Sequence, residues 1–116
     1  MDIRIKRVYD EPSDDDGFRM LVDRLWPRGI TKVRAHLDEW NKTVAPSPAL
    51  RQKFHQGDMT FAVFAKAYRA ELKELESDLD RIRAQAKKGP VTLLYGAKDP
   101  VHNHVVVLMQ ALRKHA

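Results

Sequence analysis

The chain has 116 residues, of which 43% are hydrophobic and 32% charged, and its formal net charge is +5. This length and balance predict one globular domain over residues 1–116 and argue against a disordered chain. The sequence contains no cysteine, which excludes disulfides, thiol nucleophiles and cysteine-ligated metal sites. The amino-terminal residues lack an apolar signal core, and no apolar run reaches the about 18 residues of a membrane span. We therefore expect a cytoplasmic protein with no membrane partner.

The positive charge is distributed unevenly along the chain. Residues 10–16 read Asp-Glu-Pro-Ser-Asp-Asp-Asp, whereas residues 17–116 carry 18 basic and 10 acidic side chains. A basic surface of this kind attracts anions such as phosphates, nucleotides or nucleic acid. The same composition also describes a solvated face that has no specific partner.

The amino-terminal third predicts two strands and a short helix. Ile3-Arg4-Ile5-Lys6 alternates apolar and polar residues, which predicts a strand over residues 3–9. The acidic segment that ends at Gly17 has the composition of a loop. A second strand is expected over residues 18–23, buried on both faces. Thr31 predicts the cap of a short helix over residues 32–36, and residues 37–40 fit no element.

The middle of the chain predicts three helices. Ser47 and Pro48 are typical of the cap and first position of a helix over residues 48–55. An apolar helical stripe then runs to Ile82 and includes Phe61, Phe64, Tyr68 and Leu72, which we expect in the core. Because Ser77-x-x-Asp80 is typical of a helix start, two helices are expected, over about 60–75 and 78–88. A dimeric coiled coil fits the same stripe, but its aromatic residues favour packing against a sheet.

The carboxy-terminal part predicts a buried central strand over residues 91–95 and one more helix. Asp99 and Pro100 are typical of the N-cap and first position of that helix. Helical segments separate the strands over residues 18–23 and 91–95, which favours parallel pairing between them. The fold class expected is therefore α/β, a three-layer sandwich with a small, mostly parallel sheet and helices on both faces.

Two of the predicted strands end in polar segments, residues 23–29 and 95–104. If these strands are parallel, both segments lie at the sheet edge where α/β proteins bind ligands. Arg24 and Arg28 suit bidentate binding of a phosphate or carboxylate, or else structural ion pairs with nearby acids. Trp26 suits stacking on a ligand ring or packing in the core.

Asp99 and His102 are the candidate catalytic residues. Asp99 is a candidate general base, although an Asp-Pro helix start also serves as a cap. His102 falls on the expected first helical turn, whose positive end favours a neutral imidazole. Asn103 is expected to contact the ligand beside them. No metal site is expected, since His102 and His104 point about 200° apart on a helix, and no feature identifies a cofactor or an oligomeric state.

The function that this pattern favours is an enzyme or binder acting on a small anionic ligand, phosphorylated or nucleotide-like, at the carboxyl ends of the strands. The alternative is a nucleic-acid-binding or regulatory module that uses the basic surface. No helix-turn-helix or RNA-recognition signature accompanies that surface. A third interpretation is an interaction protein whose exposed aromatic residues form an interface.

Several segments of the chain resemble a known family, namely residues 5–10, 21–29, 45–47, 68–72 and 89–95. They are similar to the short, YeaO-like branch of the family called domain of unknown function 488, and Asp-Arg-Leu-Trp-Pro-Arg-Gly at residues 23–29 is the specific string. The resemblance covers nearly the whole chain and implies a cytosolic bacterial α/β protein with a site at the strand ends. The longer branch has a Cys-His-Arg triplet at the start of the last helix, where this chain has His102-Asn103-His104.

Overall fold

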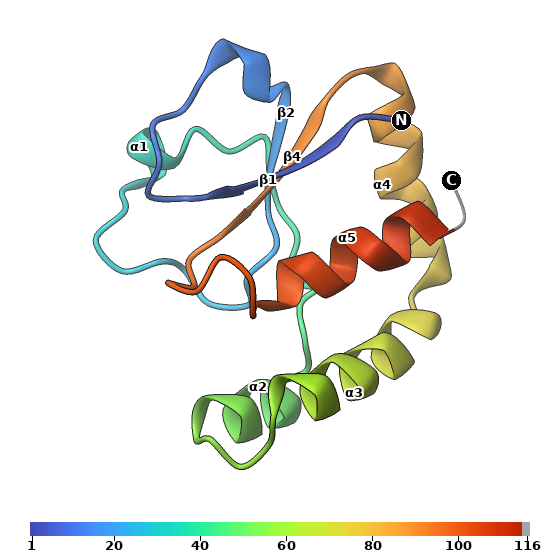
Figure 1. Ribbon diagram of the computed structural model, residues 1–116. Helices are drawn as coiled ribbons and strands as arrows, with labels where there is room; N and C mark the ends of the chain where they lie inside the picture. The colour runs from blue at the N-terminus through green and yellow to red at the C-terminus, as the bar shows by residue number, and fades with distance from the viewer. Residues whose placement is uncertain (115–116) are drawn as a thin grey trace.

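The computed structural model describes residues 1–114, which contain one four-stranded parallel sheet of order β1-β4-β2-β3 (Figure 1). The strands are β1 (Ile3–Arg7), β2 (Phe18–Leu21), β3 (Glu39–Trp40) and β4 (Val91–Tyr95). β4 pairs in parallel with both β1 and β2, which confirms the predicted pairing of the two buried strands. Every residue of β4 is buried, as expected of a parallel strand covered on both faces.

Helices cover the two faces of the sheet unequally (Figure 1). Four of them contribute to the larger core on the side of Met20 and Leu93: α2 (Pro48–His55), α3 (Phe61–Lys73), α4 (Glu76–Lys88) and α5 (His104–Lys114). The opposite face, on the side of Leu21 and Leu94, is covered by α1 (Lys32–Ala35) and the loops around it. The arrangement confirms the expected α/β sandwich. Among residues 1–114, no helix is long and apolar enough to cross a membrane.

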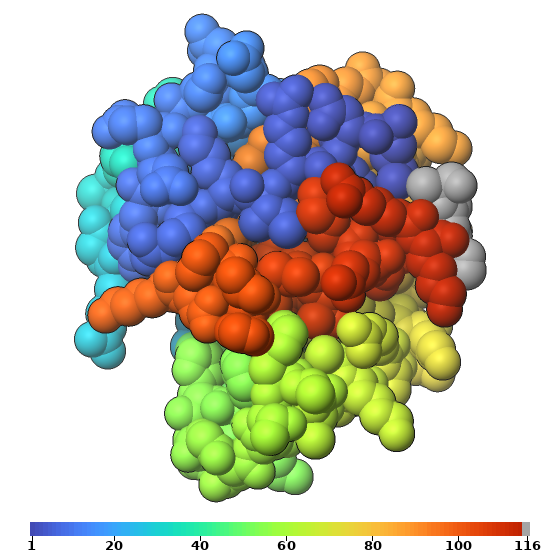
Figure 2. Space-filling view, in the orientation of Figure 1, coloured from blue at the N-terminus to red at the C-terminus, as the bar shows by residue number. Residues whose placement is uncertain are grey.

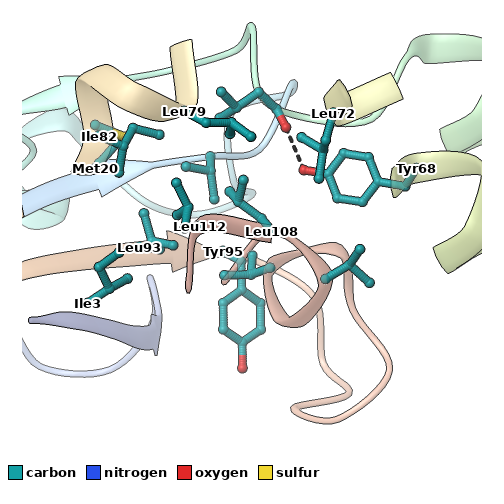
Figure 3. Close-up of a cluster of buried hydrophobic side chains, with 14 of the residues drawn as sticks. Ile3, Met20, Tyr68, Leu72, Leu79, Ile82, Leu93, Tyr95, Leu108 and Leu112 are labelled. Carbon is teal, nitrogen blue, oxygen red and sulfur yellow. Dashed lines mark hydrogen bonds between the residues drawn. The ribbon is translucent and has the colours of Figure 1, made fainter. Parts of the chain in front are cut away.

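The apolar stripe predicted between residues 61 and 82 faces the larger core. Phe64, Tyr68 and Leu72 are buried, and the hydroxyl of Tyr68 donates to the carbonyl of Val44 (Figure 3). Phe61 departs from the expectation, because it is only half-buried and packs against the edge of this core.

The break between the two middle helices is where the prediction placed it, but its cause is different. α4 begins at Glu76, so Ser77 lies inside the helix and does not cap it. The amides of Glu74 and Leu75 instead donate to carbonyls three residues earlier, at 3.1 and 3.0 Å. This tightened last turn ends α3 without any side-chain cap.

The last helix also begins later than predicted. α5 starts at His104, and the Oδ1 atom of Asn103 accepts from the amides of Val105 and Val106 at 3.0 and 3.2 Å. Asn103 is therefore the N-cap. Asp99 instead caps a separate turn before α5, where its Oδ1 atom accepts from the amides of Val101 and His102.

The acidic segment contains a structural residue that the loop assignment did not anticipate. Residues Asp14–Asp16 form a short 3-10 helix, η1, and the side chain of Asp16 is buried. Asp16 pairs with Arg19 and lies 3.2 Å from the amine of Lys6. Burial alone would raise the pKa of Asp16, but hydrogen bonds from Ser13, Lys6 and Arg19 lower it below its usual value.

Candidate functional site

A cavity of about 360 Å³ opens at the carboxyl ends of β2 and β4. The loop after β2, the last turns of α2, part of α3 and the loop between β4 and α5 all line it. Figure 2 shows that last loop, in orange, at the surface between the blue amino-terminal segment and the green α2–α3 region. The charged and imidazole side chains that line the cavity are three arginines, three histidines and one carboxylate, namely Arg24, Arg28, Arg51, His55, His102, His104 and Asp23.

Asp23 and His104 join the end of β2 to the start of α5. The Oδ2 atom of Asp23 accepts from the amide of Gly96 at 2.8 Å. The Nε2 atom of His104 lies 2.9 Å from the carbonyl oxygen of Val22 and 3.2 Å from Oδ1 of Asp23. Because a carbonyl oxygen only accepts hydrogen bonds, Nε2 carries a proton. The pair therefore fixes the orientation of the His104 ring in the cavity wall.

The two arginines expected from the sequence both line the cavity, and they differ in how much of each is engaged. Arg24 donates from Nε to the carbonyl of Pro46 at 3.1 Å and from Nη2 to that of Ala45 at 3.2 Å. Its Nη1 makes no hydrogen bond within residues 1–114. Arg28 is exposed, and within the same residues its guanidinium has no carboxylate within 4.0 Å.

Arg51 and His55 of α2 also line the cavity, although neither was singled out from the sequence. They are four residues apart, so they lie on one face of the predicted helix over residues 48–55, and that spacing was the available signal. Burial, together with nearby Arg51 and His104, lowers the pKa of His55. Burial is the main cause of this shift, and the neighbouring Arg51 and His104 act in the same direction.

Aromatic rings form a continuous row beside these charges. The rings of Phe54 and Phe64 are stacked with centroids 4.4 Å apart, Phe64 lies 5.8 Å from Tyr68, and Tyr68 lies 6.1 Å from the His104 ring. Tyr68 is neutral at ordinary pH, since burial raises its pKa well above the usual value. Of these rings, those of Phe54, Phe64 and His104 belong to the cavity wall, whereas Tyr68 lies behind them in the core.

Trp26 lines the cavity and also anchors the smaller core. Its Nε1 donates to the carbonyl of Ile30 at 2.6 Å, and its ring meets that of Trp40 edge to face, with centroids 5.2 Å apart. Both contacts hold the indole in place. Trp26 therefore supplies a fixed wall beside Arg24 and Arg28.

The two candidate catalytic residues lie in the turn before α5. Asp99 is exposed and is not part of the cavity wall, whereas His102 is. Hydrogen bonds from the amides of His102 and Val101, and the His102 ring 3.0 Å away, lower the pKa of Asp99 to about 2. A carboxylate of that acidity is a weak general base at neutral pH. The His102 ring also contacts Phe61, with centroids 5.2 Å apart.

Asn103 is buried, and both ends of its amide are engaged. Besides capping α5 with Oδ1, it donates from Nδ2 to the carbonyl of Asp99 at 2.8 Å. Asp99 accepts from the amides of Val101 and His102, and Asn103 from those of Val105 and Val106. These four amides are therefore not free to hold an incoming anion.

The functional groups that line the cavity are cationic, imidazole and aromatic side chains with a single carboxylate. The lining residues include no serine, threonine or cysteine, and the hydroxyl of Tyr9 donates to the carbonyl of Arg28 at 2.8 Å. Within residues 1–114, no three His, Asp or Glu side chains are grouped so that they would hold a metal ion. What remains is a set of cationic groups beside aromatic faces, a combination suited to anions.

Comparison with known proteins identifies the family. A family model described as "Inactive DUF488-N3 subclade" matches residues 2–116. The uncharacterized protein YeaO of Escherichia coli is 50% identical over 113 residues, which are 97% of this chain and 98% of YeaO. The uncharacterized protein Rv3073c of Mycobacterium tuberculosis is 37% identical over 110 residues, 95% of this chain and 92% of its own. No solved structure matches significantly. The resemblance found in the sequence is thereby confirmed, and the chain belongs to the DUF488 family, within its inactive N3 subclade.

Proposed function

We propose that this protein binds a small anionic ligand, phosphorylated or nucleotide-like, in the cavity at the carboxyl ends of β2 and β4. The observation that carries the proposal is the charge of the cavity wall, where three arginines and three histidines face one carboxylate. That carboxylate, Asp23, is already engaged by the amide of Gly96 and by His104. The three arginine charges outnumber this one carboxylate, which favours a ligand that brings negative charge.

Arg28 and Arg51 would hold the anion. Within residues 1–114, neither guanidinium has a carboxylate within 4.0 Å, so both remain available for a ligand. The planar fork of an arginine matches two oxygens of a phosphate or carboxylate. Arg24, which keeps Nη1 unengaged while its other nitrogens bind the carbonyls of Ala45 and Pro46, would add a third contact from a fixed position.

The rest of the ligand would lie against aromatic side chains. The side chains of Phe54, Phe64 and Trp26 line the cavity together with the arginines. A volume of about 360 Å³ is in the range of pockets that hold small organic molecules. These features favour an anion that carries a planar or apolar group over a bare inorganic ion.

The sequence predicted either an enzyme or a binder of a small anionic ligand, and we propose the binder. The matching family model is described as inactive. The cavity wall supplies neither a thiol nor an aliphatic hydroxyl, and Asp99 lies outside it. A proton-handling role for Asp99 and His102 therefore has little geometric support, and His102 would serve as a further cationic or hydrogen-bonding contact.

The proposal is tested by titrating inorganic phosphate, sulfate and mononucleotides into the protein while recording NMR shifts of His55 and residues 96–104. We expect Arg51→Ala to weaken binding about tenfold to hundredfold, the range for loss of a charged hydrogen bond. Arg28→Ala should act in the same direction. The matched control is Arg69→Ala, which removes the same charge from an exposed residue outside the cavity. The proposal fails if no anion shifts these residues, or if both cavity variants bind as well as the parent.

A further inference from the structure

We propose that His104 is a ligand-contacting residue that takes up a proton when an anion enters the cavity, with Asp23 stabilising the imidazolium that forms. This inference rests on the proposed anion binding and adds to it a residue and a dependence on pH. His102, not His104, was the histidine that the sequence pattern favoured. The spatial relation between β2 and α5 singles out His104.

Two oxygen atoms hold the Nε2 edge of the His104 ring. Nε2 lies 2.9 Å from the carbonyl oxygen of Val22 and 3.2 Å from Oδ1 of Asp23, two acceptors and no donor. Oδ1 of Asp23 is buried and makes no hydrogen bond of good geometry within residues 1–114. Oδ2 of Asp23 accepts from the amide of Gly96, so Oδ1 is the carboxylate atom left to interact with the imidazole, and a carboxylate at this distance favours the charged form of the ring.

The other ring nitrogen is the one available to a ligand. Nδ1 of His104 makes no hydrogen bond within residues 1–114, and this atom is not fully buried. It is therefore accessible to solvent, and His104 lines the cavity. Protonated, Nδ1 donates to an anion; neutral, it only accepts a hydrogen bond.

The charges around His104 oppose one another when the cavity is empty. Asp23 favours protonation, whereas the cationic groups across the cavity and the start of α5 disfavour it. Tyr68 of α3, whose ring packs against the imidazole, is neutral. The titratable and charged groups that line the cavity with His104 are Tyr9 after β1, Asp23, Arg24 and Arg28 after β2, Arg51 and His55 on α2 and His102 before α5, and Tyr68 of α3 contacts its ring.

An anion in the cavity adds a second negative charge to that of Asp23 and tips this balance toward the imidazolium. By thermodynamic linkage, anion binding must then be accompanied by proton uptake, and a fall in pH must strengthen binding. The other two cavity histidines differ from His104 because neither has a half-buried carboxylate beside it within residues 1–114. His102 is paired with the exposed Asp99, and His55 has no carboxylate within 4.0 Å among residues 1–114.

Sulfate is the probe of choice, because it remains fully ionised over the pH range in which histidine titrates, about pH 5 to 8. The histidine ring signals are followed by NMR against pH, with and without saturating sulfate. We expect sulfate to raise the titration midpoint of His104 more than that of His102. Sulfate affinity should fall with rising pH by about tenfold for each unit by which the midpoint moves.

Variants separate this contact from the rest of the site. His104→Gln should remove most of the pH dependence of sulfate affinity, whereas His102→Gln should keep it. Arg51→Ala should weaken sulfate binding in the His104→Gln background as it does in the parent protein. The titration of the parent protein needs no variant and stands if His104→Gln does not fold. Sulfate binding that leaves the His104 midpoint unchanged would overturn this inference and leave the proposed function intact. Binding of phosphate with exclusion of sulfate would also overturn it, because His104 would then act as an acceptor. Failure of sulfate, phosphate and mononucleotides alike to bind would overturn both proposals.

Discussion

The carboxylate of Asp99 accepts hydrogen bonds from the amides of Val101 and His102, at 2.9 and 3.0 Å, and these hold the turn beside the cavity. Such donors stabilise the ionised form, which is why the pKa of Asp99 falls from 3.8 to about 2. A lowered pKa means that the stabilising effect is complete above 3.8 and is lost as the pH falls through about 2. We predict that the amides of Val101 and His102 become less protected only in this acid range, as measured by NMR and hydrogen exchange.

Asp99→Asn provides the control for this turn. The amide side chain keeps one acceptor oxygen but cannot ionise, so the acid transition of the two amides should disappear. A transition centred near pH 4 in the parent protein would contradict the prediction, since it would show that Asp99 is not stabilised in the folded state.

At the cavity, the sequence predicted the residues that follow strands better than those that lie on helices. Arg24, Trp26 and Arg28 follow a recognisable strand, so their position at the sheet edge could be inferred from the parallel arrangement alone. Arg51 and His55 required knowing which face of α2 turns toward that edge. No local pattern gives that orientation, because it depends on how the helices pack together.

Asp16 illustrates the same limit for an ionisable side chain. Five acids in seven residues have the composition of a solvated loop, and four of these side chains are exposed. The fifth, Asp16, is buried because Arg19 and Lys6 meet it from β2 and β1. Sequence alone cannot distinguish it from its neighbours, since its compensating charges come from strands whose placement depends on the sheet.

At the scale of the helix, α3 joins the cavity wall to the core. Phe64 is 2% exposed, stacks on Phe54 and also lines the cavity. We predict that Phe64→Ala lowers the free energy of unfolding by about 3–5 kcal/mol, because it removes a large buried ring and leaves a void. Chemical denaturation followed by circular dichroism measures this change.

Val63 is the matched control on the same helix. Its side chain is 55% exposed, so Val63→Ala should change the free energy of unfolding by less than about 0.5 kcal/mol. Equal stability of Phe64→Ala and the parent would contradict the burial of this face. The stripe would then be available to a partner, as the interaction-protein interpretation requires.

The starts of helices were predicted correctly where the side chain of a neighbouring residue caps the helix, and less well where no such cap is present. Thr31, Ser47 and Thr60 each accept a hydrogen bond from an amide three residues later, so α1, α2 and α3 begin close to where the residue types indicate. The start of α4 has no side-chain cap, and Ser77 gave a false signal. β3 was missed because it is two residues long and is defined by pairing with β2.

The charge of the whole molecule separates ligand binding from nucleic-acid binding. A mononucleotide that makes one phosphate contact should lose only about threefold in affinity between 50 and 200 mM salt. A surface that neutralises six to ten phosphates would lose about 10³–10⁵ over the same range. We predict the weak dependence for mononucleotides, together with a preference among bases, as measured by titration at several salt concentrations.

A duplex oligonucleotide serves as the comparison in those titrations. Tight binding of the duplex with a steep salt dependence, and indifference to Arg51→Ala, would contradict the cavity and favour the basic surface. The net charge of +5 bears on non-specific association of this kind, not on recognition within a pocket.

The sheet order also has a consequence for how the chain acquires its structure during synthesis. β1 and β2 do not pair with one another, and both have β4 as their neighbour, with Ile3 opposite Val91. A growing chain therefore holds two strands that lack their common partner until residues 91–95 have been made. Most pairing within the sheet then joins residues that are distant in sequence, which raises contact order and slows folding relative to a helical bundle of equal length. Sheet assembly is therefore a late event, and a nascent chain that stops at Gly89 lacks the strand with which both β1 and β2 pair.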